Sequence, residues 1–316
     1  MNNKEAYRKL CYQEDCTIPI FSRGWWLDAV ANDEWEVALV YKDGSIYASL
    51  PYVKKSKFGL VTISQPMLTQ TLGPWIKPVK GKYSTRLSRE KELMGELIDQ
   101  LPIYARYQQS WSSTVTNWLP FYWRGFRQTS FYTYVIEDIK NAEETIKNFE
   151  GRKRTSIRKS KAEVEIIYDL SPEEFYENHV YTLEKQGELI SYPKNAFMSI
   201  YKAVEEQGCG KIIGAVDKEN KLHAAIFLVW DNEKAYVLIT TIDSDFKRYG
   251  AASYVILESI RYASRFVNKF DFEGSMIESV ERSYRQFGAK QESYSHITRT
   301  PSRILKFLDF IREVRG

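Results

Sequence analysis

Three strand-like runs adjoin in the second half of the chain with no helix between them. They span 211–217, 222–230 and 234–242, and a short charged turn joins the first two as a hairpin. A helix over 250–266 and a strand over 269–272 follow. Adjoining strands pair in an antiparallel meander, whereas a strand reached through a helix pairs in parallel. This order excludes a Rossmann fold, in which strands and helices alternate, and predicts an α/β fold with a mixed sheet.

The first half of the chain is richer in tryptophan and less regular. Seven of the eight tryptophans lie within the first 123 residues. The pattern predicts a helix over 21–31 and a hairpin of strands over 35–41 and 45–53, whose turn contains an Asp-Gly pair. The segment 65–82 is rich in proline and glycine, which predicts a loop.

The length of the chain and this change in character predict two domains. A chain of 316 residues, at about 150 residues per domain, suffices for two. We place the domains at 1–138 and 139–316. Trp75 and Trp123 lie near predicted loops of the first domain, where an indole ring can stack on a sugar or another flat group of a substrate. Packing in the core is the alternative for each of them.

The composition excludes several classes of protein. The net charge of +4 is too small for a polycationic nucleic-acid coat, and the longest apolar run, 224–230, is far shorter than the ~20 residues that span a bilayer. The polar start shows no secretory signal, and the cysteines and histidines lack the spacing of metal ligands. No serine-hydrolase or P-loop motif is present. We therefore expect a cytoplasmic protein that does not insert into membranes and needs no metal.

The junction between the strand over 234–242 and the next helix is the most informative segment. Residues 244–252 read SDFKRYGAA. Small residues let an anion approach the backbone, and the N–H groups and dipole of a helix start attract it. The segment therefore predicts a phosphate-binding loop; packing of the helix on the sheet is the alternative for its small residues. The residues of this predicted loop are Lys247, Arg248, Gly250, Ala251 and Ala252.

Two motifs resemble the GNAT acyltransferase superfamily. Lys247-x-x-Gly250-x-Ala252 is similar to the Arg/Gln-x-x-Gly-x-Gly/Ala loop that binds the pyrophosphate of coenzyme A, although lysine replaces the preferred first residue. Tyr284-Arg285-Gln286-Phe287-Gly288 resembles the family's Tyr-x-x-x-Gly, whose tyrosine is often the general acid. The resemblance implies an acyl-CoA donor. It also implies that the thioester carbonyl meets backbone N–H groups of the preceding strand, at Ile239, Thr240, Thr241 and Ile242.

Further stretches resemble the Fem-like acyltransferases. The segment 152–160, RKRTSIRKS, is similar to their Arg-x-x-Ile-Arg-Lys-Ala stretch, and DFEGS at 271–275 resembles their C-terminal end. Fem-like proteins consist of two GNAT-like domains in tandem. The resemblance therefore implies two tandem GNAT-like domains here, with 1–138 as a degenerate copy and 139–316 as the donor-binding copy.

A basic segment lies in a helix predicted over 142–162. Residues 152–161 hold six cations and no acid. Arg154 and Arg158 are four residues apart and share a helical face, which can bind phosphates of tRNA, coenzyme A or a nucleotide-linked acceptor. A solvated helix is the alternative.

Acyl transfer to an amine needs a base, a donor to the oxyanion and help for the leaving group. The candidate bases are Asp243, Asp245 and Glu273. Glu273 ends an apolar strand, where partial desolvation would raise its pKa; a cap or ion pair is the alternative. Tyr284 is the candidate acid, with packing of its helix face as the alternative.

These observations predict an N-acyltransferase. It would move an acyl group from acyl-CoA, or an aminoacyl group from aminoacyl-tRNA, to an amine acceptor bound between the domains. One alternative is a Fem-type aminoacyltransferase that acts on a cell-wall precursor with charged tRNA. Others are a non-catalytic protein that binds a nucleotide-containing or glycan ligand, and an RNA-binding module. The sequence leaves the oligomeric state open.

Overall fold

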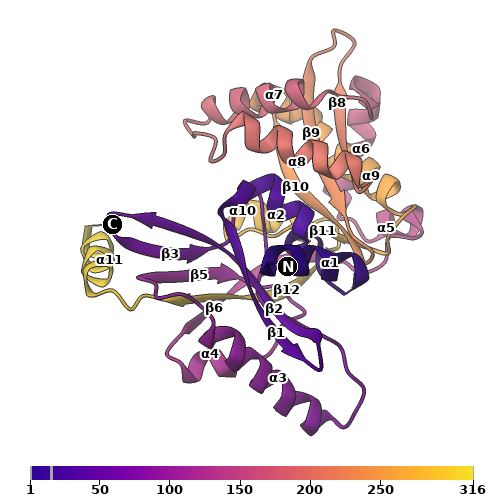
Figure 1. Cartoon of the computed structure of the whole chain (residues 1–316). Coiled ribbons are helices and arrows are strands. Elements are labelled where there is room, and N and C mark those ends of the chain that lie inside the picture. The colour runs from indigo at the N-terminus through magenta and orange to yellow at the C-terminus, as the bar shows by residue number, and fades with distance from the viewer. Residues whose placement is uncertain (1, 15–16, 316) are drawn as a thin grey trace. The chain divides into compact units, whose positions relative to one another are not determined.

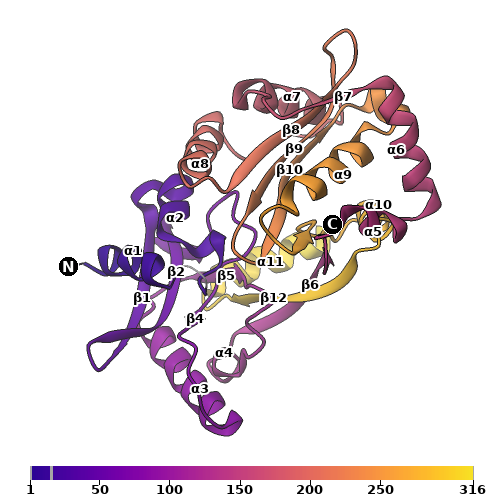
Figure 2. The same ribbon diagram turned by 90° about the vertical axis from the view of Figure 1, so that its right-hand side faces the viewer.

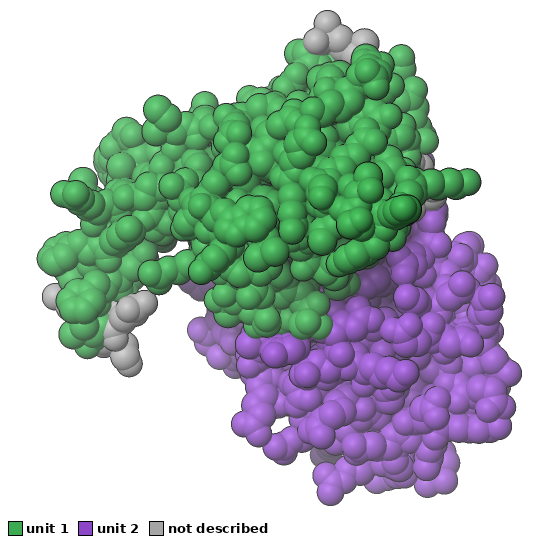
Figure 3. Space-filling view, turned by 90° about the horizontal axis from the view of Figure 1, so that it is seen from below, with its two compact units in different colours: residues 1–131, 293–316 green, residues 132–292 purple. Residues whose placement is uncertain are grey.

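A computed structural model describes residues 2–14 and 17–315 (Figure 1). The chain forms two compact units, which Figure 3 distinguishes by colour. Unit 1 comprises residues 1–131 and 293–316, and unit 2 comprises residues 132–292. Residues 293–316 thus belong with the N-terminal part of the chain by compactness, and the expected division at 138/139 stays a prediction.

Unit 1 is built on a five-stranded path, β1-β2-β3-β5-β12, to which β4 adds a short pairing with β2. Neighbouring strands are antiparallel except β3 and β5, which are parallel. The strands are β1 (Trp35–Lys42), β2 (Ser45–Lys57), β3 (Leu60–Ser64), β4 (Trp75–Ile76), β5 (Arg106–Ser110) and the end of β12 (Lys290–Arg299). The helices, with η for a 3-10 turn, are α1 (Asn3–Gln13), η1 (Ile20–Ser22), α2 (Gly24–Ala31), η2 (Asn32–Glu34), α3 (Tyr83–Asp99), α4 (Leu119–Trp123) and α11 (Arg303–Arg315).

The expected hairpin is present as β1 and β2, and tryptophans fill the core of unit 1. Trp26, Trp35 and Trp111 are fully buried. The sequence reasoning did not propose α1. Its start is a capping box in which the side chain of Asn2 accepts from the backbone N–H of Glu5 and the Glu5 carboxylate accepts in return.

Unit 2 is built on the path β6-β11-β10-β9-β8-β7. Only β10 and β11 are parallel, as their connection through a helix predicts. The strands are the end of β6 (Arg127–Ile136), β7 (Glu165–Ile167), β8 (Gly210–Val216), β9 (Leu222–Trp230), β10 (Lys234–Ile242) and β11 (Lys269–Asp271). The helices are α5 (Ala142–Lys147), α6 (Gly151–Glu163), α7 (Pro172–Glu184), α8 (Lys194–Glu206), η3 (Ser244–Tyr249), α9 (Ala251–Ala263) and α10 (Glu278–Arg285).

Strand β9 is buried on both faces, which explains its unbroken apolar sequence. Figure 2 shows α7 and α8 on one face of its sheet and α9 on the other. Ile226 and Leu228 belong to the core cluster that α9 contributes to. Phe227, which points to the opposite face, contacts Phe175 of α7 and Phe197 of α8. Helices therefore cover both faces of this sheet.

The single helix predicted over 142–162 is wrong, because the chain breaks between α5 and α6. Phe149 is fully buried and packs edge-on against Phe287, with ring centroids 5.1 Å apart. Placing Phe149 in the core turns the backbone, and Glu150 leaves the helical conformation as the N-cap of α6. In the described part of the chain, no helix has the length and apolar character needed to cross a bilayer.

Candidate active site

Strands β10 and β11 diverge within unit 2. They pair only over Lys234–Tyr236 and Lys269–Asp271, whereas β10 stays paired with β9 as far as Ile242. From Val237 onward, no strand of the described residues lies on the other edge of β10. Backbone N–H and C=O groups on such an edge can bind an extended ligand. The candidate thioester contacts at Ile239–Ile242 lie on this stretch.

The open stretch of β10 begins at a β-bulge. Val237 pairs with Leu228 and Ile239 with Phe227, so the intervening residue is extra in β10. A bulge bends the strand and re-aims its backbone groups. Beyond it, the hydroxyl of Thr241 is 2.8 Å from Asn178 Oδ1 and 2.9 Å from Thr182 Oγ1, both on α7. The side chain of Thr241 is thus committed to packing on α7.

The predicted phosphate loop forms η3, Gly250 and the first turn of α9. Gly250 has φ +77°, and a Cβ there would overlap Ser156 Oγ of α6. Only glycine combines this conformation with this approach. In the first turn of α9 the N–H of Ser253 donates to Gly250 O at 3.0 Å, and the N–H groups before it lie at the positive end of the helix dipole, which favours an anion beside them. Lys247 and Arg248, also in the loop, are exposed.

Because Ser156 of α6 contacts Gly250, the cations of α6 that share the helical face of Ser156 lie on the same side as the loop. Arg152 and Lys159 are four residues before and three after Ser156, so they share its face. Both are exposed. Arg154 and Arg158 lie two residues to either side, at about 200° around the helix. The structure therefore places Arg152 and Lys159, which sequence reasoning did not single out, beside the loop.

Arg154 has a local role as well. Its Nη1 donates to the carbonyl oxygens of Lys147, at 2.9 Å, and Phe149, at 2.7 Å, at the end of α5. Lys153, another of the six cations, points inward and donates to Ser283 Oγ at 2.8 Å. Burial lowers the pKa of Lys153 to about 8.

Two of the three candidate bases are bound to one lysine. Lys185 Nζ lies 2.5 Å from Asp243 Oδ1 and 2.7 Å from Asp245 Oδ2. Asp243 also accepts from the backbone N–H of Asp245 and so caps η3. These hydrogen bonds raise the pKa of Lys185 above its usual range. Asp243 and Asp245 thus stabilise the turn that leads into the loop.

Glu273 follows β11 in a strained backbone conformation. Its φ is +59°. Gly274 after it has φ +68°, and a Cβ on Gly274 would overlap Tyr132 O of β6, so both the conformation and the close approach require glycine. Glu273 is 8% exposed. Burial, and secondarily the negative charge of Asp271, raise the pKa of Glu273 well above the ordinary value. The expected upward shift is therefore present in this structure.

Asp271 organises the residues around Glu273 and was missed by sequence reasoning. Its Oδ1 accepts from Thr133 Oγ1 and, at 2.9 Å, from the backbone N–H of Glu273. Its Oδ2 lies 3.3 Å from Lys234 Nζ. Lys234 also lies 3.8 Å from Glu292, whose pKa burial raises. These buried contacts hold the turn in which Glu273 lies. They join residues far apart in the sequence, so no local sequence pattern predicts them.

Tyr284 of α10 packs on Phe272, the residue that precedes Glu273 in the chain. The rings of Tyr284 and Phe272 are 4.8 Å apart. Burial, with a smaller contribution from the charge of Glu273, raises the pKa of Tyr284 to about 12. The phenol thus keeps its proton at neutral pH. The structure brings a carboxyl group and a protonated phenol together beside the point where β10 and β11 diverge.

The two tryptophans proposed for the acceptor lie in different surroundings in unit 1. Trp75 is 6% exposed, its Nε1 donates to Thr17 Oγ1 at 3.1 Å, and it lines a cavity of about 300 Å³. Trp123 is 60% exposed, with Lys91 Nζ 5.4 Å from its ring centroid. Their role in binding an acceptor stays a prediction.

Comparisons with known proteins agree with this geometry. Residues 136–277 match the family model described as an acetyltransferase (GNAT) domain. No curated protein sequence matches the chain. Among solved structures, FemX superposes with a TM-score of 0.65 and 12% identity over 98% of both chains.

Two further structures cover nearly the whole chain. A tandem GNAT protein from the clavulanic acid biosynthesis pathway has a TM-score of 0.54 and 9% identity over 94% of both chains. The C-terminal domain of a putative lysylphosphatidylglycerol synthetase from Agrobacterium fabrum has a TM-score of 0.58 and 10% identity over 96% of this chain and 94% of that one. Such identities show the fold, and the expected mixed α/β fold of two tandem GNAT-like domains is confirmed.

Proposed function

We propose that this chain, whose residues 136–277 match the family model of a GNAT acetyltransferase domain, is an N-acyltransferase that carries its donor on unit 2. The fold supports acyl or aminoacyl transfer in general. The observation that carries the proposal is the divergence of β10 from β11. An open backbone edge leads to an anion-binding loop, and a buried carboxyl group and a phenol lie where the strands separate.

The reaction that these groups support is attack of an amine on the acyl carbonyl. Glu273 in its ionised form accepts the proton that the amine loses, and its raised pKa makes that carboxylate a stronger base than an ordinary one. Backbone N–H groups of Ile239–Ile242 donate to the oxyanion of the tetrahedral intermediate. Tyr284 donates its proton to the departing thiolate as the C–S bond breaks. Exchange with water then returns the proton to Tyr284 and removes one from Glu273.

The donor in this proposal is acyl-CoA, held by its pyrophosphate. The N–H groups of Ala251 and Ala252 at the start of α9 meet the phosphates, and Lys247 and Arg248 add positive charge. Arg152 and Lys159 extend this positive surface along α6.

Two double charge reversals, which change the net charge equally, test the donor site. By calorimetry with acetyl-CoA, Arg152→Glu/Lys159→Glu is expected to weaken binding roughly tenfold, because two attractive charges next to the phosphates become repulsive. Arg154→Glu/Arg158→Glu reverses charges on the far side of α6 and should change the affinity less. Equal losses would indicate long-range attraction without a local site. Absence of binding by the wild type at about millimolar acetyl-CoA, the upper end of usual substrate affinities, would refute this donor.

One observation favours aminoacyl-tRNA as a second candidate donor. The five exposed cations of α6 form no ion pair with any described residue within 4.0 Å, which leaves them available to a polyanion. They are Arg152, Arg154, Arg158, Lys159 and Lys161. If tRNA is the donor, both double variants lose tRNA affinity, and the wild-type affinity falls steeply with rising salt. The acceptor in either case is an amine, and the proposal extends to an amine on a cell-wall precursor.

A further inference from the structure

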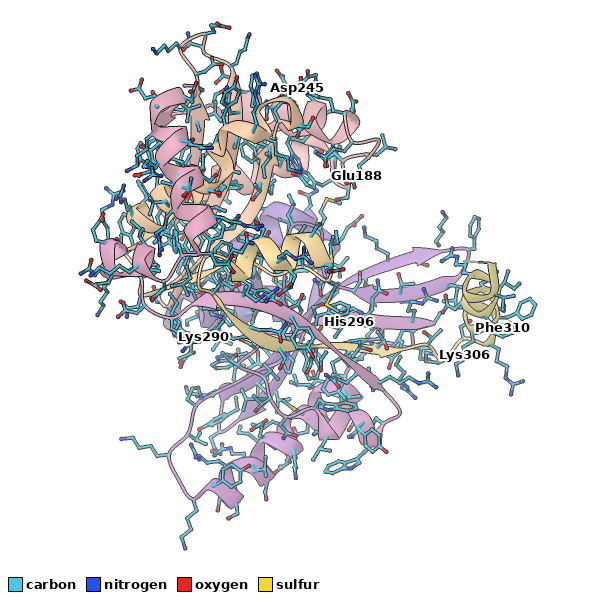
Figure 4. The ribbon with its side chains drawn as sticks, turned by 180° about the vertical axis from the view of Figure 1, so that it is seen from behind. Glu188, Asp245, Lys290, His296, Lys306 and Phe310 are labelled. Carbon is cyan, nitrogen blue, oxygen red and sulfur yellow. The ribbon has the colours of Figure 1, made fainter. Side chains whose placement is uncertain are left out.

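The C-terminal helix α11 exposes its apolar residues. Five large apolar side chains on it are 46% to 70% exposed, whereas Leu305 and Ile311 are half-buried. Exposure of this extent is far above what the apolar side of a helix packed on a protein core shows. Figure 4 shows Phe310 projecting from α11, where it also borders the cavity that Arg106 and Asp309 line. The exposed apolar residues are Ile304, Phe307, Leu308, Phe310 and Val314.

An ion pair fixes the orientation of α11. Asp309 Oδ2 lies 2.5 Å from Arg106 Nη2 of β5. At about 100° per residue, Asp309 lies on the side of the helix opposite the middle of its apolar residues. Because Arg106 holds the polar side of α11 against the sheet of unit 1, the apolar side faces solvent.

The turn between β2 and β3 supplies a second exposed apolar group, surrounded by lysines. Phe58 at its tip is 91% exposed, and Lys54, Lys55 and Lys57 beside it are exposed. Lys55 pairs across the sheet with Thr62, and Thr62 pairs with Arg106. The hairpin tip therefore lies at the end of the sheet that holds α11, as Figures 1 and 4 show. We call the hairpin tip and the exposed side of α11 together the α11 patch.

The charge of the α11 patch is positive. Arg303, Lys306 and Arg312 are exposed on α11, in addition to the three lysines of the hairpin. A cavity of about 710 Å³ at this end of unit 1 is lined by four cations and one described acid, Asp309, which Arg106 neutralises. The four cations that line the cavity are Arg106, Arg127, Arg299 and Lys306.

We propose that the α11 patch docks unit 1 on the surface of an anionic phospholipid bilayer. The helix lies in the plane of the interface, Phe307, Phe310 and Phe58 enter the acyl region, and the cations meet the headgroup phosphates. An amphipathic helix whose apolar side is rimmed by cations has this complementarity. A second copy of the chain does not, because a symmetric contact through this patch would bring like charges together.

Vesicle flotation of the full chain tests the proposal. Phosphatidylcholine vesicles with phosphatidylglycerol should carry the wild type, and pure phosphatidylcholine vesicles should carry much less. Phe307→Ser/Phe310→Ser should lower the partition coefficient roughly tenfold for each ring removed. Lys55→Glu/Lys57→Glu should lower it roughly fivefold for each charge, and high salt should reproduce that loss.

Matched variants on unit 2 serve as controls. Leu189→Ser removes another side chain that is 88% exposed, and Lys218→Glu reverses another exposed lysine; both should bind vesicles as the wild type does. Melting temperatures check that each variant is folded. The proposal is overturned if the wild type ignores anionic vesicles, or if the α11 variants bind them unchanged. A third outcome would also overturn it. In that outcome the wild type does not bind vesicles, light scattering shows that it is a dimer, and Phe307→Ser/Phe310→Ser is the one variant that makes it a monomer.

Discussion

Glu273 combines burial, a strained backbone and a carboxyl group that is difficult to ionise. Each feature is unfavourable in itself: a positive φ costs a non-glycine residue about 1–2 kcal/mol, and desolvation opposes the charged form. Neighbouring residues hold the conformation, since Asp271 binds the backbone N–H of Glu273 and Gly274 fits against β6. Such arrangements concentrate at functional sites, which is why Glu273 is the base in the proposed mechanism.

Replacement of Glu273 by glutamine separates catalysis from stability. Turnover should fall at least about 10²-fold, because glutamine cannot accept the proton. The free energy of unfolding at neutral pH should instead rise. The pKa of Glu273 is higher in the folded protein than in the unfolded chain, so wild-type stability declines as the pH rises from the ordinary glutamate pKa toward the raised value. Glutamine does not titrate and lacks this decline.

Thermal melts over that pH range and turnover at neutral pH measure the two effects of Glu273→Gln. An enzyme that keeps its turnover would remove Glu273 from the mechanism, whatever the melts show. A melting temperature that falls at neutral pH would contradict the electrostatic argument for this site.

Tyr284→Phe tests the proposed acid. Its pKa of about 12 keeps the phenol protonated over the range in which proteins are assayed, so the lost hydroxyl is a lost proton donor. We expect turnover to fall by about 10²-fold or more, while the retained ring keeps its packing on Phe272 and the melting temperature changes little. Tyr262→Phe on α9 is the matched control and should leave turnover as it is. If both variants are equally active, the tyrosine only packs the helix.

Elements adjacent in the chain were predicted well, because their pairing follows from local connectivity. The hairpin of β8 and β9, the neighbouring β10 and the parallel return through α9 to β11 all follow from the order of apolar runs. The break between α5 and α6 was not predictable in the same way. It depends on Phe149 meeting Phe287, a residue far along the chain, while the intervening sequence is compatible with a helix.

Gly250 joins η3 to α9, and its replacement tests that junction. Gly250→Ala places a Cβ against Ser156 at a positive φ, and we expect it to lower the free energy of unfolding by roughly 1–3 kcal/mol. Gly151→Ala is the control, because a Cβ added there would meet no other part of the protein within 4 Å, and it should stay within about 0.5 kcal/mol of the wild type. Urea unfolding measures both. If Gly250→Ala and Gly151→Ala have the same free energy of unfolding, α6 moves away from the added Cβ without a loss of stability.

At the scale of the whole molecule, the chain returns to its first unit at the end. Strand β12 pairs with β5 through His296 and Ser110, whose side chains also meet at 3.0 Å between Nδ1 and Oγ. These partners are far apart in the sequence, and nothing in the local pattern of β12 selects β5. The ion pair of Asp309 with Arg106 also joins residues that are far apart in the sequence, and it turns the apolar side of α11 outward.

The sequence by itself determined the order of strands in the mixed sheet of unit 2 and the position of the loop that we propose binds an anion, because periodicity, turns and small residues act over a few neighbouring residues. It also indicated Glu273 as a candidate base and Tyr284 as the candidate acid. Only the tertiary structure decided that Asp271 and Lys234 accompany Glu273, and that Arg152 and Lys159 lie beside Gly250. These arrangements depend on burial and on contacts between distant segments, which create desolvation and charge proximity that no local pattern encodes.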